Sequence, residues 1–301
     1  MFFFSKKTTI AASGILQGAT DHHSHILPGV DDGVETMDEA LHILATYEAA
    51  GVKTLWLTPH IMEDIPNTPQ KLEARFLELK AAYTGSIELH LAAEYMIDNH
   101  LRKLLQEAPP RFRGEVVEDR RGEEKTKECP QGSIVNQSEV TEGSKTTSNK
   151  LRPALEGRWH EQSEVTEGSN NKLLPIGSKG NHLLVETSYF NPPMRFRETL
   201  RQIKSLGYHP LLAHPERYMY MDNDEYQELH DEGVRFQLNL PSLCGAYGNT
   251  VKKKAEWLLS NGLYSVAGSD LHCEDAITVI TGCKMATKSI GHIAKILNNK
   301  I

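Results

Sequence analysis

The sequence has 301 residues, a formal net charge of −7 at pH 7 and an isoelectric point near 6.1. This length suffices for one large domain or two small ones, each with a substantial buried core. The acidic balance argues against a protein that binds nucleic acid or anionic membranes through bulk charge. The four cysteines show neither CxxC spacing nor a disulfide framework, which fits a reducing compartment.

The first 18 residues contain no recognisable targeting or membrane segment. Three large apolar residues in a row, Phe2 to Phe4, are followed directly by Ser5, Lys6 and Lys7. Such a run is too short for the core of a signal peptide and far too short to span a bilayer. We therefore expect residues 1–18 to be an N-terminal extension of a cytoplasmic protein that does not insert into membranes.

Between residues 20 and 105 the sequence alternates between short apolar runs, typical of strands, and amphipathic stretches, typical of helices. The stretch 35–50 places Met37, Leu41 and Leu44 on one helical face, and Gly51 follows as a helix terminator. We expect strands at 19–23, 52–58 and 86–94, and helices at 35–50, 68–83 and after Glu94.

The same alternation resumes after residue 181. We expect strands at 182–186, 209–213, 234–240 and 263–269, and helices at 194–206, 224–232 and about 251–260. Repeated strand–helix units of this length imply an α/β fold with a parallel sheet, either open or closed into a barrel. We assign residues 19–301 to one such domain.

The segment from about 107 to 180 interrupts this pattern. It is rich in charged and small polar residues, and it contains the octapeptide QSEVTEGS twice, at 137–144 and at 162–169. Such a composition buries too little apolar surface to offset the entropy of ordering. We interpret it as a disordered insertion in a surface loop, with a functional repeat module as the alternative. Because it follows a helix and precedes a strand, we expect it on the face of the barrel away from the strand carboxyl ends.

Histidine, aspartate or glutamate residues stand at or just beyond the ends of six expected strands. In an extended segment, residues i and i+2 point to the same side, so His23 and His25 can converge on one cation. Alone, this pair is more typical of surface histidines. Its recurrence at one edge, where the carboxyl ends of parallel strands meet, indicates a shared pocket. The candidate ligands are His23, His25, Asp32, His60, Glu94, Glu186, His214, Asp270 and His272.

The four carboxylates in this set would repel one another strongly without cations. Two or three divalent metals resolve that conflict, and mixed imidazole and carboxylate ligands suit Mn, Fe or Zn. Divalent cations activate water and neutralise phosphate charge, so phosphate monoesters are the natural substrates. Arg217 follows the candidate ligand His214 and is suited to grip phosphate oxygens with two nitrogens, or alternatively to form a surface salt bridge.

The ordered motifs DHHSHILPGVDDG, TPH, AAEYM, VETS, AHPERY and GSDLH resemble the polymerase and histidinol phosphatase (PHP) superfamily. Within it they look most similar to the bacterial protein-tyrosine phosphatases of the YwqE and CpsB type. The resemblance covers about residues 19–106 and 181–275. It implies a distorted (β/α)7 TIM-like barrel and a trinuclear site, usually studied with Mn²⁺. On that pattern the nine residues above are the metal ligands and Arg217 is the phosphate-binding residue.

The implied substrates are phosphotyrosines on a bacterial tyrosine kinase that controls capsular or extracellular polysaccharide export. The sequence departs from the family at His22, where an aliphatic residue is usual, and in the insertion. One alternative is a small-molecule phosphatase of the same superfamily, such as one that acts on histidinol phosphate, and another is an inactive barrel adaptor. Aromatic residues at 189–193 and 218–221 suit an entrance for a protein-borne phenol, or they are packing residues.

Overall fold

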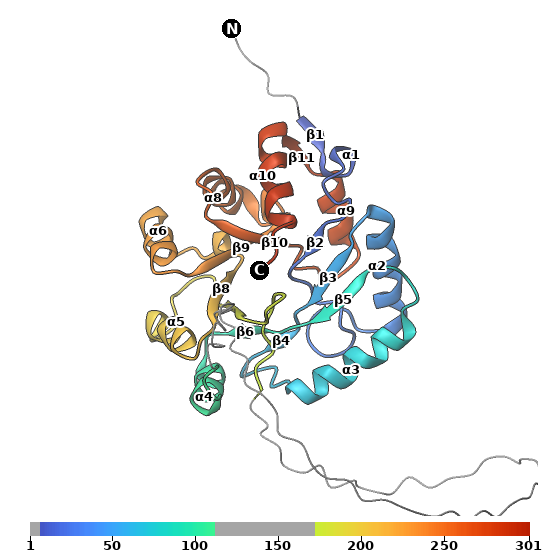
Figure 1. Cartoon of the computed structure of the whole chain (residues 1–301). Helices are drawn as coiled ribbons and strands as arrows, with labels where there is room; N and C mark the ends of the chain where they lie inside the picture. Colours follow the sequence, from blue (N-terminus) through green and yellow to red (C-terminus); the bar gives the residue numbers. More distant parts are fainter. Residues whose placement is uncertain (1–6, 112–171) are drawn as a thin grey trace, which may run out of the picture. The chain divides into compact units, whose positions relative to one another are not determined.

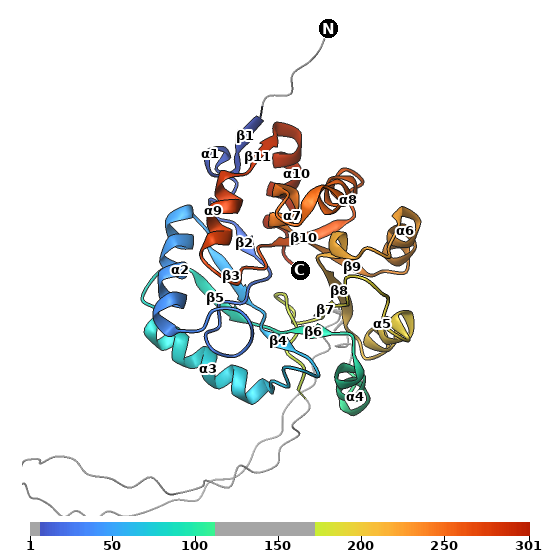
Figure 2. The same cartoon turned by 180° about the vertical axis from the view of Figure 1, so that it is seen from behind.

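The computed structural model describes residues 7–111 and 172–301, which Figures 1 and 2 show from opposite sides. Its strands form an inner ring, and its helices lie mainly outside that ring (Figure 1). No helix within these two ranges is long and apolar enough to cross a membrane. The nine strands of the ring are β2 (Thr20–Asp21), β3 (Thr54–Leu57), β4 (His60–Ile61), β5 (Glu88–Leu91), β6 (Glu94–Met96), β7 (His182–Glu186), β8 (His209–Ala213), β9 (Arg235–Asn239) and β10 (Tyr264–Gly268).

These strands occupy seven parallel positions in chain order, because β3 continues into β4 and β5 continues into β6. One sheet has the order β2-β3-β5 and the other the order β10-β9-β8-β7-β6-β4. The parallel pairs β3–β5 and β4–β6 carry the ladder from one sheet to the other. The ring closes between β10 and β2, where Ser24 bridges Leu271 and His22 N donates to Ala267 O. This arrangement confirms the expected distorted (β/α)7 barrel.

A helix follows each strand position, and residues that the sequence places at the helix starts cap several of them. Thr36, Thr68 and Asp98 each accept a hydrogen bond from the backbone N–H three residues later, and Asp222 forms a full capping box with Glu225. The helices of the barrel are α2 (Met37–Ala50), α3 (Pro69–Ala82), α4 (Asn99–Glu107), α5 (Phe196–Ser205), α6 (Asn223–Asp231), α8 (Gly248–Ser260) and α10 (Thr287–Leu297).

Several short elements add to this framework, and the sequence patterns did not predict them. They are β1 (Lys7–Thr9), α1 (Ile10–Ser13), η1 (Pro215–Arg217), α7 (Leu240–Cys244), α9 (Asp275–Gly282) and β11 (Lys284–Ala286). The strand β1 pairs antiparallel with β11, and Ile10 is buried. Residues 7–18 are therefore packed into the barrel unit, so the expected extension 1–18 is wrong for them. Residues 1–6 lie outside the described ranges.

The boundaries of the expected insertion, 107–180, also need correction. Glu107 ends α4, and the chain from 172 to 180 is part of the barrel. Leu173, Leu174 and Ile176 are buried, and Leu174 N donates to the hydroxyl of Tyr95 at 2.8 Å. These apolar residues adjoin the second repeat, so composition averaged over the segment concealed them. The expected disorder and both repeats fall on residues outside the described ranges.

Replacing residues 114–168 with a short Gly-Ser link is expected to leave the thermal unfolding temperature nearly unchanged, since the described residues form their own core. Extending the deletion to Gly177 removes Leu173, Leu174 and Ile176. Each loss of such a side chain lowers the free energy of unfolding by about 2–5 kcal/mol. The three losses together approach the whole stability of a domain, which is about 5–15 kcal/mol. Thermal melts of both variants test this, and a shorter deletion that fails to fold would contradict it.

Candidate metal centre

The structure brings all nine candidate ligands together at the carboxyl ends of the barrel strands. Most line a pocket of about 790 Å³, and His23 and His25 lie buried beneath it. The two histidines follow β2, and Asp32 lies in the loop after them. His60 and Glu94 open β4 and β6, and Glu186 ends β7. His214, Asp270 and His272 follow the last residues of β8 and β10.

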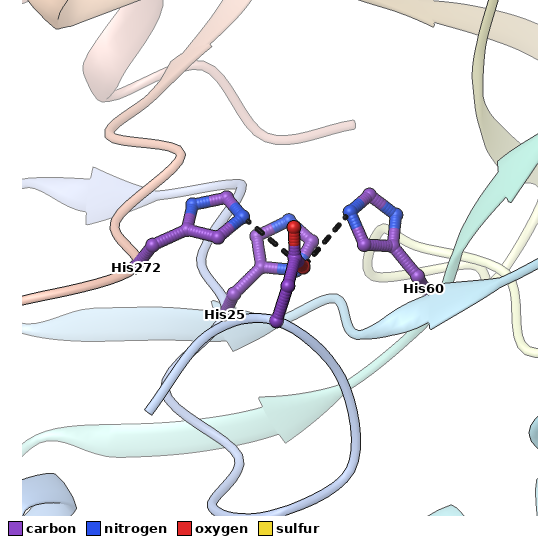
Figure 3. Close-up of side chains that lie close together, drawn as sticks. His25, His60 and His272 are labelled. Carbon is purple, nitrogen blue, oxygen red and sulfur yellow. Dashed lines mark ion pairs between the residues drawn. The ribbon is translucent and has the colours of Figure 1, made fainter. Parts of the chain in front are cut away.

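The nine side chains form three overlapping groups, each with ligand atoms within 4.8 Å of one another. Figure 3 shows three imidazoles of the first group, His25, His60 and His272, turned toward a common region. His60 and Glu94 each belong to two groups, so neighbouring groups share a side chain. The groups are His25, Asp32, His60 and His272; His23, Glu94, His214 and Asp270; and His60, Glu94 and Glu186.

Glu94 lies at the centre of the pocket and its side chain is fully buried. Its Oε1 atom is 3.2 Å from His214 Nε2. Its Oε2 atom is 3.1 Å from His23 Nε2 and 3.3 Å from both His25 Nε2 and His60 Nδ1. Glu94 thus contacts side chains of all three groups, the second through both oxygens and the other two through Oε2.

The donor set fits divalent cations better than it fits a protein interior without them. In the described ranges, the buried Nδ1 atom of His214 has no hydrogen-bond partner, and that of His60 lies within 3.3 Å of the carboxylates of Glu94 and Glu186 without hydrogen-bond geometry. Burial and the nearby Glu94 and Asp270 carboxylates raise the pKa of Glu186 well above its usual range. Divalent cations would bind the imidazole nitrogens and would neutralise the charge of the buried carboxylates. Nitrogen and oxygen donors without thiolates suit Mn, Fe or Zn.

Two residues that the sequence analysis did not select orient these histidines. Asp31 Oδ2 lies 2.8 Å from His25 Nδ1 and accepts a hydrogen bond from the backbone of His60 at 3.0 Å. Burial alone would raise the pKa of Asp31, but the hydrogen bond and charge of His25 bring it to about 2. Gln237 Oε1 lies 2.8 Å from His23 Nδ1. Partners of this kind fix the ring orientation of ligand histidines.

The backbone around the pocket is strained and closely packed. His214 and Asp270 have φ values of 33° and 51°, in the left-handed region that non-glycine residues seldom adopt. A Cβ atom on Gly268 would lie 2.5 Å from the Cβ of His23. Only glycine fits there, so the GSDLH motif supplies both the close approach of β10 to His23 and the turn that carries Asp270.

His22, unlike its neighbour His23, belongs to none of the candidate ligand groups. Its side chain is buried, and its Nδ1 atom lies 3.1 Å from Ala267 O. Burial lowers its pKa to about 4, so the imidazole is neutral at physiological pH. A neutral, hydrogen-bonded imidazole therefore fills this buried position.

Arg217 lines the same pocket as seven of the nine candidate ligands. Its Nη1 atom is 2.8 Å from Asp270 Oδ2, and its side chain is 17% exposed. Its guanidinium carbon lies 4.3 Å from the ring centres of both Tyr189 and Tyr247, so two aromatic rings hold the guanidinium. This geometry leaves the remaining nitrogens of Arg217 available beside the candidate metal groups.

The aromatic residues that the sequence singled out divide into two roles. Tyr189 and Phe190 line the pocket. Tyr218 is instead a buried packing residue, whose hydroxyl donates to Ala213 O and accepts from Thr187 N. The sequence alone did not separate these roles.

A buried carboxyl group supports the segment that carries Arg217. Glu216 is fully buried, and burial raises its pKa to about 7. Its two oxygens accept hydrogen bonds from Asn239 N at 3.0 Å and from the Tyr264 hydroxyl at 2.8 Å. Asn239 in turn donates to Asp270 Oδ2 at 2.9 Å. These contacts connect η1, β9 and β10 behind the pocket.

Comparisons with known proteins identify relatives of one type. The family model for capsular polysaccharide synthesis, CpsB/CapC, matches residues 19–111 and 121–292. The tyrosine-protein phosphatase CpsB of Streptococcus pneumoniae is 26% identical over 263 residues, covering 85% of this chain and 84% of its own. CapC of Staphylococcus aureus is 24% identical over 255 residues, covering 84% of this chain and 76% of its own.

A solved structure also shares the fold. The structure reported for YwqE from Bacillus subtilis and CpsB from Streptococcus pneumoniae, as metal-dependent tyrosine phosphatases, superposes with a TM-score of 0.58 at 17% identity. The match covers 90% of this chain and 84% of that one. Since the family model covers most of the sequence, the chain belongs to the CpsB/CapC family of capsular polysaccharide synthesis.

Proposed function

We propose that this chain is a metal-dependent protein-tyrosine phosphatase and that the nine clustered side chains bind its metals. The observation that carries the proposal is the joint placement of three overlapping ligand groups and Arg217 in one pocket. The names of the relatives CpsB and YwqE, both tyrosine-protein phosphatases, support the same activity. Metal-dependent hydrolysis of phosphotyrosine is served by metal ligands together with a cationic side chain for the phosphate, and this pocket offers both.

Each part of the pocket has a role in this reaction. Bound divalent cations would neutralise phosphate charge and activate the attacking water. Arg217 binds the phosphate oxygens that face away from the ligand groups, and Tyr189 and Tyr247 hold its guanidinium in place. Asp31 and Gln237 keep His25 and His23 in the orientations that point their Nε2 atoms into the pocket.

Manganese is the metal we favour, with iron and zinc as the other candidates. The ligand set and its geometry exclude neither iron nor zinc, because manganese, iron and zinc all accept imidazole and carboxylate donors. Two or three ions fit the three groups of ligands. His60 and Glu94 each belong to two of these groups, so they would help to hold more than one ion.

The proposed substrate is a phosphotyrosine protein, namely a bacterial tyrosine kinase of capsular polysaccharide export, and the proposed location is the cytoplasm. Membership of the capsular polysaccharide family supports this partner. The net charge of −7 is unfavourable for nucleic acid as a partner.

A small-molecule phosphatase of the same superfamily is the second candidate, since it would use the same ligands. The aromatic side chains of Tyr189, Phe190 and Tyr247 on the pocket wall favour a phenolic ester over a polar alkyl ester such as histidinol phosphate. An inactive adaptor is disfavoured because all nine candidate ligands remain in place.

Removal of metals is expected to abolish hydrolysis of p-nitrophenyl phosphate, and Mn²⁺ is expected to restore it best. The protein should be stripped with a chelator and assayed with Mn²⁺, Zn²⁺, Fe²⁺ and Mg²⁺ added separately. The restored enzyme should turn over a phosphotyrosine peptide faster than histidinol phosphate. Full activity in the stripped protein would disprove the metal requirement, and a preference for histidinol phosphate would favour the second candidate.

A further inference from the structure

Exposed apolar side chains gather on the loops beside the candidate metal centre. Among the described residues, six large hydrophobic side chains are exposed. Four of them lie on loops that follow the neighbouring strands β7, β8 and β9. We name these four the apolar rim: Phe190 (74% exposed), Met194 (82%), Met219 (48%) and Tyr247 (39%). Single exposed apolar residues are common, but a cluster beside a pocket indicates an interaction surface.

Hydrogen bonds hold the loops that carry the apolar rim. Met219 N donates to Tyr189 O at 2.7 Å, which joins the loop after β8 to the loop after β7. Arg102 on α4 donates to Met194 O at 3.1 Å. Because these loops are already fixed, a partner that covers their apolar side chains loses little additional backbone entropy.

The apolar rim is continuous with the pocket that holds Arg217. Phe190 and Tyr247 line this pocket and are also exposed. Tyr247, together with Tyr189, contacts the guanidinium of Arg217, and Phe190 is the next residue after Tyr189. A substrate that places its phosphate beside Arg217 and continues out of the pocket on this side passes over the rim.

We propose that the apolar rim binds apolar side chains that flank the phosphotyrosine of a protein substrate. The proposal rests on the proposed phosphatase function and specifies the substrate sequence that the site prefers. A small phosphate ester ends inside the pocket, so Met194 and Met219 contribute nothing to its binding. An extended protein segment continues past the phosphotyrosine, and burial of one flanking apolar side chain strengthens its binding by about fivefold to thirtyfold.

Two phosphotyrosine peptides test this, one with leucine and one with serine on both sides of the phosphotyrosine. The metal-loaded full chain should show a kcat/KM for the leucine peptide that is higher by at least about fivefold to thirtyfold, the gain expected when one of its two leucines is buried. The double variant Met194→Ser/Met219→Ser should lose this preference. The control variants Leu77→Ser and Val279→Ser alter exposed apolar residues on α3 and α9, outside the rim, and should keep it.

The outcomes separate the two proposals. Equal kcat/KM for both peptides, with hydrolysis of p-nitrophenyl phosphate intact, would overturn the role of the rim and leave the phosphatase function standing. No hydrolysis of p-nitrophenyl phosphate with any metal would overturn the phosphatase function itself. Double-variant protein that changes oligomeric state in light scattering but keeps the peptide preference would make the rim an interface between copies, which also overturns the proposal.

Discussion

Glu94→Gln is expected to lower turnover of p-nitrophenyl phosphate by about a thousandfold. Rate losses of this size follow when one preorganised group that stabilises the transition state is removed. It should also reduce the amount of bound metal. The carboxylate of Glu94 contacts all three ligand groups, with Oε1 toward His214 and Oε2 toward His23 and His60. Glutamine has nearly the same shape, but it is neutral and one of its terminal atoms is a donor. It therefore cannot serve two cation sites at once.

The measurement should join activity with metal content and fold. Elemental analysis after Mn²⁺ loading should show fewer ions per chain in Glu94→Gln than in the unmodified protein, while circular dichroism shows the same secondary structure. Glu88→Gln provides the control, because Glu88 is exposed and lies at the amino end of β5, opposite the strand ends that carry the candidate ligands. Unchanged metal content and turnover in Glu94→Gln would remove Glu94 from the ligand set.

The sequence predicted most of the barrel because each strand–helix unit carries its own local signals. Caps such as Thr36 and Asp222 lie at the starts of helices, and apolar runs mark the strands. It did not predict that the expected strand 86–94 divides at Ala92 and Ala93, where pairing passes from one sheet to the other. It also missed β1, since that strand is defined only by pairing with residues 284–286 at the other end of the chain. Such features depend on distant contacts and leave no local pattern.

The sequence predicted which side chains gather in the pocket, because parallel strands bring their carboxyl ends to one edge. It did not distinguish the roles of the adjacent Asp31 and Asp32. The structure buries Asp31 against His25 and leaves the side chain of Asp32 63% exposed at the pocket mouth. Gln237 and Glu216 were also missed, although a polar residue inside an apolar strand such as 234–240 is a usable signal. The positive φ angles at the pocket have no counterpart in local sequence.

Arg217→Lys is expected to slow turnover by about tenfold to a thousandfold although the charge is kept. The guanidinium lies between Tyr189 and Tyr247 with 4.3 Å to each ring centre, and it contacts Asp270 through Nη1. A flat group can stack between two rings and still offer two nitrogens to a phosphate. An ammonium is compact and strongly hydrated, so it offers one point of attachment and stacks poorly.

Arg197→Lys is the matched control for this change, because Arg197 on α5 contacts Glu228 and Glu232 through two nitrogens on the outer surface. It should alter turnover by less than about twofold, as surface ion pairs contribute little. Metal content should stay the same in Arg217→Lys, and the inhibition constant of inorganic phosphate should rise with the loss of turnover. A lower rate with unchanged phosphate inhibition would mean that Arg217 only positions Asp270, and an unchanged rate would exclude it from the reaction.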